Sequence, residues 1–257
     1  GRRCGLQFMI LAFILYTCMG RELRLKKFVL PAFMFVGAFT CIVAVFQYIG
    51  VDFLEIRDGL ASSIRDIYIS TFGNIDIFAS FLCILIPVAL GAGLDERRIY
   101  DGDAIWKFNW SKLSVWAAVF TGAAAIVVTN ANLAYAGVST AVVIVFLVSA
   151  YGGKLKEFLE LVLAMALGFL AVSLMLKTSP DSIEKLDGIS NFARYTGLIA
   201  AVSGTLAVIR IILLAVEKLG RSQDKNEKTS SKFGGKVPFV ICSVLVIVGI
   251  AGMIIYS

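Results

Sequence analysis

A polar turn directly before a long apolar stretch carries Thr71, Gly73, Asn74 and Asp76. Gly73 can adopt the positive φ of a tight turn, and Asn74 can cap a helix by accepting hydrogen bonds from its first N–H groups. Asp76 then falls in the first helical turn, where the helix dipole stabilises a carboxylate. Two roles are open for this helix start. It either caps a membrane span or receives an anionic phosphate on its unpaired N–H groups.

Arg65, Asn132 and Arg194 are the other polar residues that could contact a phosphate. Arg65 precedes the Gly73 turn and would assist the helix start. Asn132 lies with Asn130 in a short turn, where asparagine either stabilises a helix connection or contacts a ligand. Arg194 is either an interfacial anchor or a phosphate contact. These patterns single out no catalytic residue.

The chain that positions these residues is strongly apolar. Of its 257 residues, 59% are hydrophobic and 16% charged, and the mean hydropathy is +0.87. These values lie well outside the usage of soluble globular proteins. Because about 20 apolar residues cross a bilayer as a helix, we predict an all-α, polytopic transmembrane helix bundle of about eight spans, with seven to nine compatible with the pattern. The spans are 5–19, 28–49, 71–94, 113–129, 134–151, 158–176, 197–217 and 237–256.

The predicted organisation is a single transmembrane helical domain over residues 1–257. We expect the short spans 113–129 and 134–151 to form a tight pair across the 130–133 turn. An outer loop, 50–69, is predicted to form an amphipathic interfacial helix, because its apolar residues recur at helical spacing. These residues are Phe53, Ile56, Leu60, Ile64 and Ile67. A segment rich in Lys, Ser, Asp and Gly, 218–236, is predicted to be a flexible cytoplasmic linker.

The distribution of lysine and arginine orients the bundle, because these residues concentrate in cytoplasmic loops. One set of inter-span segments holds 16 of them, whereas the alternating set holds seven. The basic set comprises 20–27, 95–112, 152–157 and 218–236, and the other set comprises 1–4, 50–68, 130–133 and 177–196. We therefore expect a multi-pass protein of the cell membrane whose N-terminus, 70–74 turn and Ser257 face outward. The net charge of +6 needs no nucleic-acid partner, since this bias and attraction to anionic lipid explain it.

Arg210 lies inside the predicted span 197–217. An arginine at this depth is costly unless it pairs with an acid or extends its guanidinium to the nearer membrane surface. We expect the second, because the cytoplasmic end at Glu217 and Lys218 is about two helical turns away. Glu157 and Glu160, at the start of another span, are predicted to be interfacial. The five cysteines lack C-x-x-C spacing and the chain has no histidine, so the sequence predicts no metal site, no other cofactor and no disulfide framework.

Three motifs together resemble the O-antigen ligase and O-antigen polymerase family. They are Phe46-Gln47-Tyr48-Ile49-Gly50 before the outer loop, Thr71-Phe72-Gly73-Asn74 after it, and Ile86-Pro87 in the next span. Family members commonly follow the second motif with Pro and Asn, where this chain has Ile75 and Asp76. An arginine commonly precedes it, and Arg65 is the nearest candidate. A later family turn has Ser and Arg where this chain has Ala131 and Asn132.

The resemblance implies the membrane architecture of C-type glycosyltransferases. It implies a transferase that takes a glycan from a polyprenyl diphosphate carrier and joins it to an acceptor sugar or glycolipid at the outer membrane face, in cell-surface polysaccharide biosynthesis. Residues at the candidate helix starts would bind the lipid phosphate. Family ligases are expected to use a histidine and an arginine in a late outer loop. Because this chain contains no histidine, we interpret it as a partial chain that supplies the carrier-binding half.

Two other classes of function stay open. Breaks around Gly73-Asn74 and Asn130-Asn132 could line the pathway of a small-solute or lipid transporter. The absence of an arginine at position 132 favours a non-catalytic membrane partner of an assembly machine. Glycan transfer without solute flux would separate the enzyme from the transporter, and co-purification of a catalytic subunit would indicate the partner.

Overall fold

The computed structural model describes residues 28–61, 64, 68–94 and 110–223, and within these residues it is all-helical. Six of its helices are long and apolar enough to cross a bilayer, which indicates a multi-pass membrane protein. This finding confirms six of the predicted spans, while 5–19 and 237–256 lie outside the described residues. The elements are α2 (Val29–Tyr48), α4 (Ile75–Leu94), α6 (Trp110–Thr129), α7 (Asn132–Tyr151), α8 (Leu155–Lys177), α9 (Pro180–Glu184), the 3₁₀ helix η1 (Gly188–Arg194) and α10 (Thr196–Gln223).

Helix α6 lies at the centre of the bundle and contacts α2, α4 and α8. Its second half, from Thr121 to Thr129, is buried throughout. Small residues make this possible, because helices in a membrane approach closely where side chains are short. A Cβ atom built on Gly122 would lie 2.9 Å from Ile86 Cγ1, and one built on Gly168 of α8 would lie 2.2 Å from Phe120 O. Glycine is therefore required where α8 crosses α6.

Helix α7 packs mainly against α4 and then against α8. Cys83 of α4 lies beside the start of α7, with its Sγ 3.9 Å from Ala134 O. The expectation of a tight α6–α7 pair is therefore wrong, although a short turn joins the two helices. The physical reason is that α4 and α8 already occupy the surface of α6. Asn130, at φ 55°, turns the chain sharply enough to lead α7 away.

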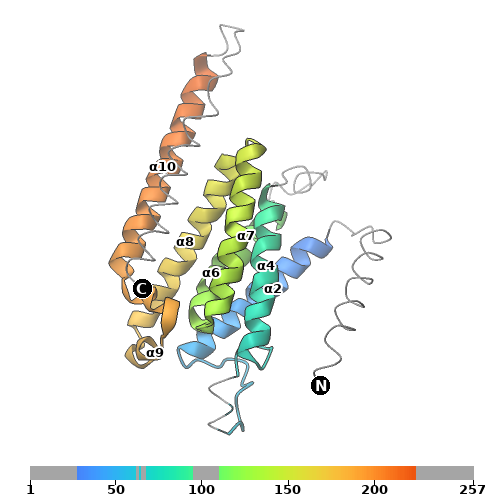
Figure 1. The fold of residues 1–257 in the computed structure, drawn as a ribbon, viewed down its shortest axis with the longest axis vertical. Coiled ribbons are helices and arrows are strands. Elements are labelled where there is room, and N and C mark those ends of the chain that lie inside the picture. Colours follow the sequence, from blue (N-terminus) through green and yellow to red (C-terminus); the bar gives the residue numbers. More distant parts are fainter. Residues whose placement is uncertain (1–27, 62–63, 65–67, 95–109, 224–257) are drawn as a thin grey trace.

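Helix α10 lies along the outer side of α8 and extends beyond the other helices (Figure 1). Ser203 donates a hydrogen bond to Ala166 O of α8 at 3.2 Å. Arg210 forms an ion pair with Glu160 of α8. The guanidinium is thus paired with an acid, which is the alternative that the sequence did not favour. Lys112 Nζ of α6 lies 3.6 Å from the same carboxylate. Glu160 is thus an interhelical partner, where the sequence suggested only an interfacial position.

We call the end of the bundle formed by residues 49–61, 68–74, 130–131 and 178–195 the long-loop end. At the opposite end, α10 continues to Gln223, so the first residues of the predicted flexible linker are helical and the remainder lies outside the described residues. The predicted amphipathic helix over 50–69 is also wrong for residues 50–61, which form turns. Glu55 at φ 53° and Gly59 at φ 76° are incompatible with a continuous right-handed helix.

We expect Gly168→Ala to lower the free energy of unfolding by about 3 kcal/mol, because the added methyl group would collide with the backbone of α6. Gly204→Ala on α10 is the matched control. Nothing lies within 4 Å of its Cβ position, and alanine should raise helix stability there by about 0.5–1 kcal/mol. Denaturant titration of both variants in mixed micelles measures the difference. Unchanged stability of Gly168→Ala would contradict the close α6–α8 crossing.

Candidate functional site

Buried polar groups fix the path of the chain at the end of α2. Gln47 is 2% exposed. Its Oε1 accepts a hydrogen bond from Ser70 N at 2.7 Å, and its Nε2 donates to Asp52 Oδ1 at 3.1 Å. Ser70 also donates from its hydroxyl to Thr40 O at 2.6 Å. These bonds tie both ends of the long loop to α2.

Arg57, inside this loop, forms hydrogen bonds to residues on both sides of it. Its guanidinium donates to Gln47 O at 2.9 Å through Nη1 and to Tyr68 O at 2.6 Å through Nη2. Asp52 Oδ2 accepts from Arg57 N at 2.7 Å. Burial opposes ionisation of Asp52, but the hydrogen bonds from Arg57 and Gln47 and the charge of Arg57 prevail and lower the pKa of this carboxyl. The predicted phosphate contact Arg65 lies outside the described residues.

The start of α4 has the predicted cap. Gly73 has φ 70°, and Asn74 Oδ1 accepts hydrogen bonds from Asp76 N at 2.7 Å and from Ile77 N at 3.3 Å. Asp76 lies in the first turn, and Thr71, Asn74 and Asp76 are exposed. Because Asn74 occupies two of the first N–H groups, this helix start works first as a cap and retains fewer donors for a phosphate.

Asn130 and Asn132 bind a segment that is distant in sequence. Asn130 Nδ2 donates to Lys185 O at 3.3 Å, and its Oδ1 accepts from Asp187 N at 3.0 Å. Asn132 Oδ1 accepts from Ile189 N at 3.3 Å. The two asparagines thus hold the connection between α9 and η1 against the start of α7. The sequence suggested that these amides stabilise a short helix connection or contact a ligand. In the structure they bind a segment that lies more than 50 residues away.

A polar cluster follows this connection at the long-loop end. Arg194 is exposed, and its Nη2 donates to Ile183 O at 3.2 Å and to Leu186 O at 3.3 Å. The hydroxyl of Tyr48 and Oδ1 of Asn191 are buried and have no hydrogen-bond partner in the described structure. Since buried polar atoms are normally paired, such atoms mark a place for water or a ligand. We call Tyr48, Asn191 and Arg194 the rim cluster.

Two contacts hold the rim cluster together. Ser182 Oγ donates to Tyr48 O at 3.1 Å, which joins the end of α2 to the segment before η1. The hydroxyls of Tyr135 on α7 and Ser190 in η1 lie 3.0 Å apart. Arg194 Nη2 binds Ile183 O, next to Ser182, so Arg194 and Tyr48 lie on adjoining segments. The cluster therefore combines a cation, a hydroxyl and an amide oxygen on segments that are cross-braced.

The structure joins Asn132 to η1, which ends at Arg194, through the bond to Ile189 N, whereas no bond joins Asn74 to either residue in the described structure. Cys83 lies level with Ala134, so Asn74, nine residues earlier, lies about 13 Å further along the axis of α4. Sequence reasoning missed Tyr48 and Asn191 as site residues. The proximity of Asn191 to Arg194 in the sequence was a usable signal for one, whereas the unpaired hydroxyl of Tyr48 is a consequence of packing.

Comparison with protein-family models, with curated proteins and with solved structures returns no match for this chain. The functional interpretation therefore depends on the motifs and on the geometry of the long-loop end.

We expect Asn130→Ala to release the connection between α9 and η1, because two long-range hydrogen bonds disappear together. Hydrogen exchange of the Asp187 amide should become at least about fivefold faster, the effect of losing about 1 kcal/mol of hydrogen bonding. Thr140→Ala on α7 is the matched control, since that hydroxyl bonds only to Ala136 O of its own helix. Equal exchange in both variants would contradict the bracing role.

The long loop should loosen in acid. Because the folded-state pKa of Asp52 lies below its ordinary value of 3.8, its stabilising effect is complete above that pH and is lost as the pH falls through the folded-state value. Hydrogen exchange of the Arg57 amide, corrected for the intrinsic rate, should progressively lose protection as the pH falls below 3.8. Asp52→Asn should remove this dependence, while Asp58→Asn in the same loop should preserve it. The same pH dependence in the wild type and in Asp52→Asn would contradict a stabilising role for the bond between Asp52 and the Arg57 amide.

Proposed function

We propose that this protein is a membrane-embedded glycan ligase or polymerase. It takes a glycan from a polyprenyl diphosphate carrier and transfers it to an acceptor sugar at the outer face of the membrane. The single observation that carries this proposal is the rim cluster. Its exposed Arg194 guanidinium is bonded to Ile183 O, beside Ser182, which binds the end of α2 at Tyr48, and the Tyr48 hydroxyl is buried without a partner in the described structure. The orientation follows from the lysine and arginine distribution, which favours an outward-facing long-loop end.

The chemistry of the rim cluster suits a diphosphate-linked sugar. An arginine guanidinium carries a permanent charge and can bind phosphate oxygens bidentately. Two backbone carbonyls fix the position of the Arg194 guanidinium, so little side-chain freedom is lost on binding. The Tyr48 hydroxyl can donate to a phosphate oxygen, and Asn191 Oδ1 can accept from a sugar hydroxyl.

Transfer requires stabilisation of the diphosphate leaving group. Negative charge develops on the bridging oxygen as the glycosyl bond breaks, and preorganised donors and cations stabilise it. Arg194 supplies the cation in this proposal. The apolar flanks of α7 and α10 would hold the polyprenyl chain, since exposed large side chains such as Leu133 and Leu198 lie near the same end.

The departure at Asn132 fits this arrangement. The family turn has an arginine at that position, whereas here Asn132 binds the backbone at Ile189. This bond positions η1, whose last residue is Arg194. We therefore propose that the phosphate-binding arginine is carried by η1 in this protein, and that Asn130 and Asn132 position it.

One observation favours a second candidate function, a transporter for a small charged solute. Glu157 Oε2 and Arg210 Nη1 are buried without a hydrogen-bond partner in the described structure, and both lie on helices that can cross the membrane. Ionisable residues at membrane depth mark transport pathways in many proteins. In this reading the α8–α10 interface would line the path.

We expect Arg194→Ala in the full-length protein to lower glycan transfer at least about tenfold, because a desolvated charge contact to the leaving group is lost. The assay measures release of polyprenyl diphosphate from a glycan-linked donor in proteoliposomes. Lys185→Ala is the matched control, since this exposed lysine lies on the same rim and uses its backbone oxygen, not its side chain, to bind Asn130. Arg194→Lys should recover part of the activity.

Unchanged transfer by Arg194→Ala would remove the rim cluster from the site. Arg65→Ala, tested in the same assay, is also expected to lower transfer about tenfold if Arg65 assists the carrier phosphate. Solute flux in the same proteoliposomes without any transfer, abolished by Glu160→Gln, would favour the transporter.

A further inference from the structure

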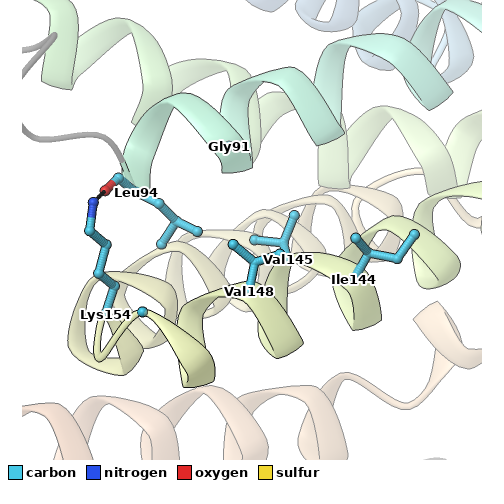
Figure 2. Close-up of a pocket in the computed structure, with 7 residues that line it drawn as sticks. Gly91, Leu94, Ile144, Val145, Val148 and Lys154 are labelled. Carbon is cyan, nitrogen blue, oxygen red and sulfur yellow. Dashed lines mark hydrogen bonds between the residues drawn. The ribbon is translucent and has the colours of Figure 1, made fainter.

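An apolar groove lies between α4 and α7 at the end of the bundle opposite the rim cluster (Figure 2). Its volume is about 350 Å³. Side chains of α7 form one wall, and the backbone of α4 at Gly91 forms the other. Ile144, at 55% exposure, and Val148, at 59%, face the surroundings of the bundle. Since both helices can cross a bilayer, the groove opens toward lipid.

Gly91 keeps the groove open. A Cβ atom at this position would meet no atom within 4 Å, so packing inside the bundle does not require glycine here. This differs from Gly168, where the neighbouring backbone leaves no room for a side chain. The missing side chain at Gly91 therefore creates space on the lipid-facing surface.

Lys154 is the one cation among the described residues that line the groove. Lys154 is half-buried, and its Nζ donates to Leu94 O, the last carbonyl of α4, at 2.5 Å. This bond caps the helix, where the dipole favours a positive charge. An ammonium group has three donors, and among the described residues Lys154 uses one of them, in this bond. The cap thus holds a cation beside the apolar wall of the groove.

We propose that the groove binds one anionic phospholipid, with an acyl chain along α7 and the headgroup phosphate at Lys154. The apolar wall of the groove would contact an acyl chain, and Lys154 at its membrane-surface end would contact the phosphate of the headgroup. Basic pockets between transmembrane helices recognise anionic headgroups in this way. The volume lies within the range of small-molecule sites. This site is separate from the rim cluster, so its test does not depend on the proposed transferase activity.

The test is native mass spectrometry of the full-length protein, released from nanodiscs that contain equal amounts of phosphatidylglycerol and phosphatidylethanolamine with identical acyl chains. The wild type should retain one phosphatidylglycerol in preference to phosphatidylethanolamine. Lys154→Gln should lower this preference about fivefold, the effect of one lysine charge at an anionic surface. Lys156→Gln, which removes an exposed lysine two residues later, is the matched control and should change the preference less than twofold.

Gly91→Leu tests the groove while the Lys154 cap is intact. The added side chain should fill the open space and lower retention of both lipids at least about fivefold. Gly204→Leu on α10 is its control, because nothing lies within 4 Å of that Cβ position either, and it should retain lipid as the wild type does. Equal retention of the two lipids by the wild type, or wild-type retention by Gly91→Leu, would overturn the proposal. A dimer that Gly91→Leu abolishes would also overturn it, in favour of a second copy as the occupant.

Discussion

Close approach of α8 to α6 is the constraint on which the rest of the structure depends. A helix surrounded by other helices in a membrane gains little from apolar burial alone, because lipid is equally apolar, and it depends on tight packing. Gly168 allows the crossing at Phe120, and the small residues of α6 allow α4 to approach from another side. On α8, Glu160 pairs with Arg210 of α10, and Ser173 donates a hydrogen bond to Ala193 O near the end of η1. The place of α8 therefore determines the places of α10 and η1. The position of Arg194 therefore depends on the contact between α8, at Gly168, and the small residues of α6.

The two ends of the bundle use polar groups differently. At the long-loop end, Gln47, Arg57, Asn130 and Asn132 satisfy backbone groups of loops that leave the helices. This satisfaction is required because an unpaired backbone group near hydrocarbon is costly. Two buried atoms at this end, the hydroxyl of Tyr48 and Oδ1 of Asn191, have no hydrogen-bond partner in the described structure, and in the proposed function they contact a polar ligand. At the opposite end, Glu160 pairs with Arg210 and Lys112, and Lys154 caps the last carbonyl of α4.

Much of the helical framework could be predicted from sequence, because apolar length and cap residues act locally. The six described spans and the cap at Asn74 are examples, and Asn74 bonds to N–H groups only two and three residues away. The loop 50–61 could not be predicted in this way. Its apolar spacing indicated a helix, but Arg57 bonds to Gln47 and Tyr68, which lie ten and 11 residues away. Likewise, periodicity does not encode which side chain pairs with Arg210 or which segment Asn130 binds, since these partners lie at least 50 residues away.

The most direct test of the proposed carrier site is photo-cross-linking. A polyprenyl diphosphate with a photoreactive group next to the diphosphate would be added to the full-length protein in nanodiscs, and labelled peptides would be identified by mass spectrometry. We predict labelling of residues 182–195 and of the end of α2 near Tyr48, with competition by unlabelled carrier. Competed labelling confined to the α8–α10 interface or to the opposite end of the bundle would contradict the rim cluster as the diphosphate site.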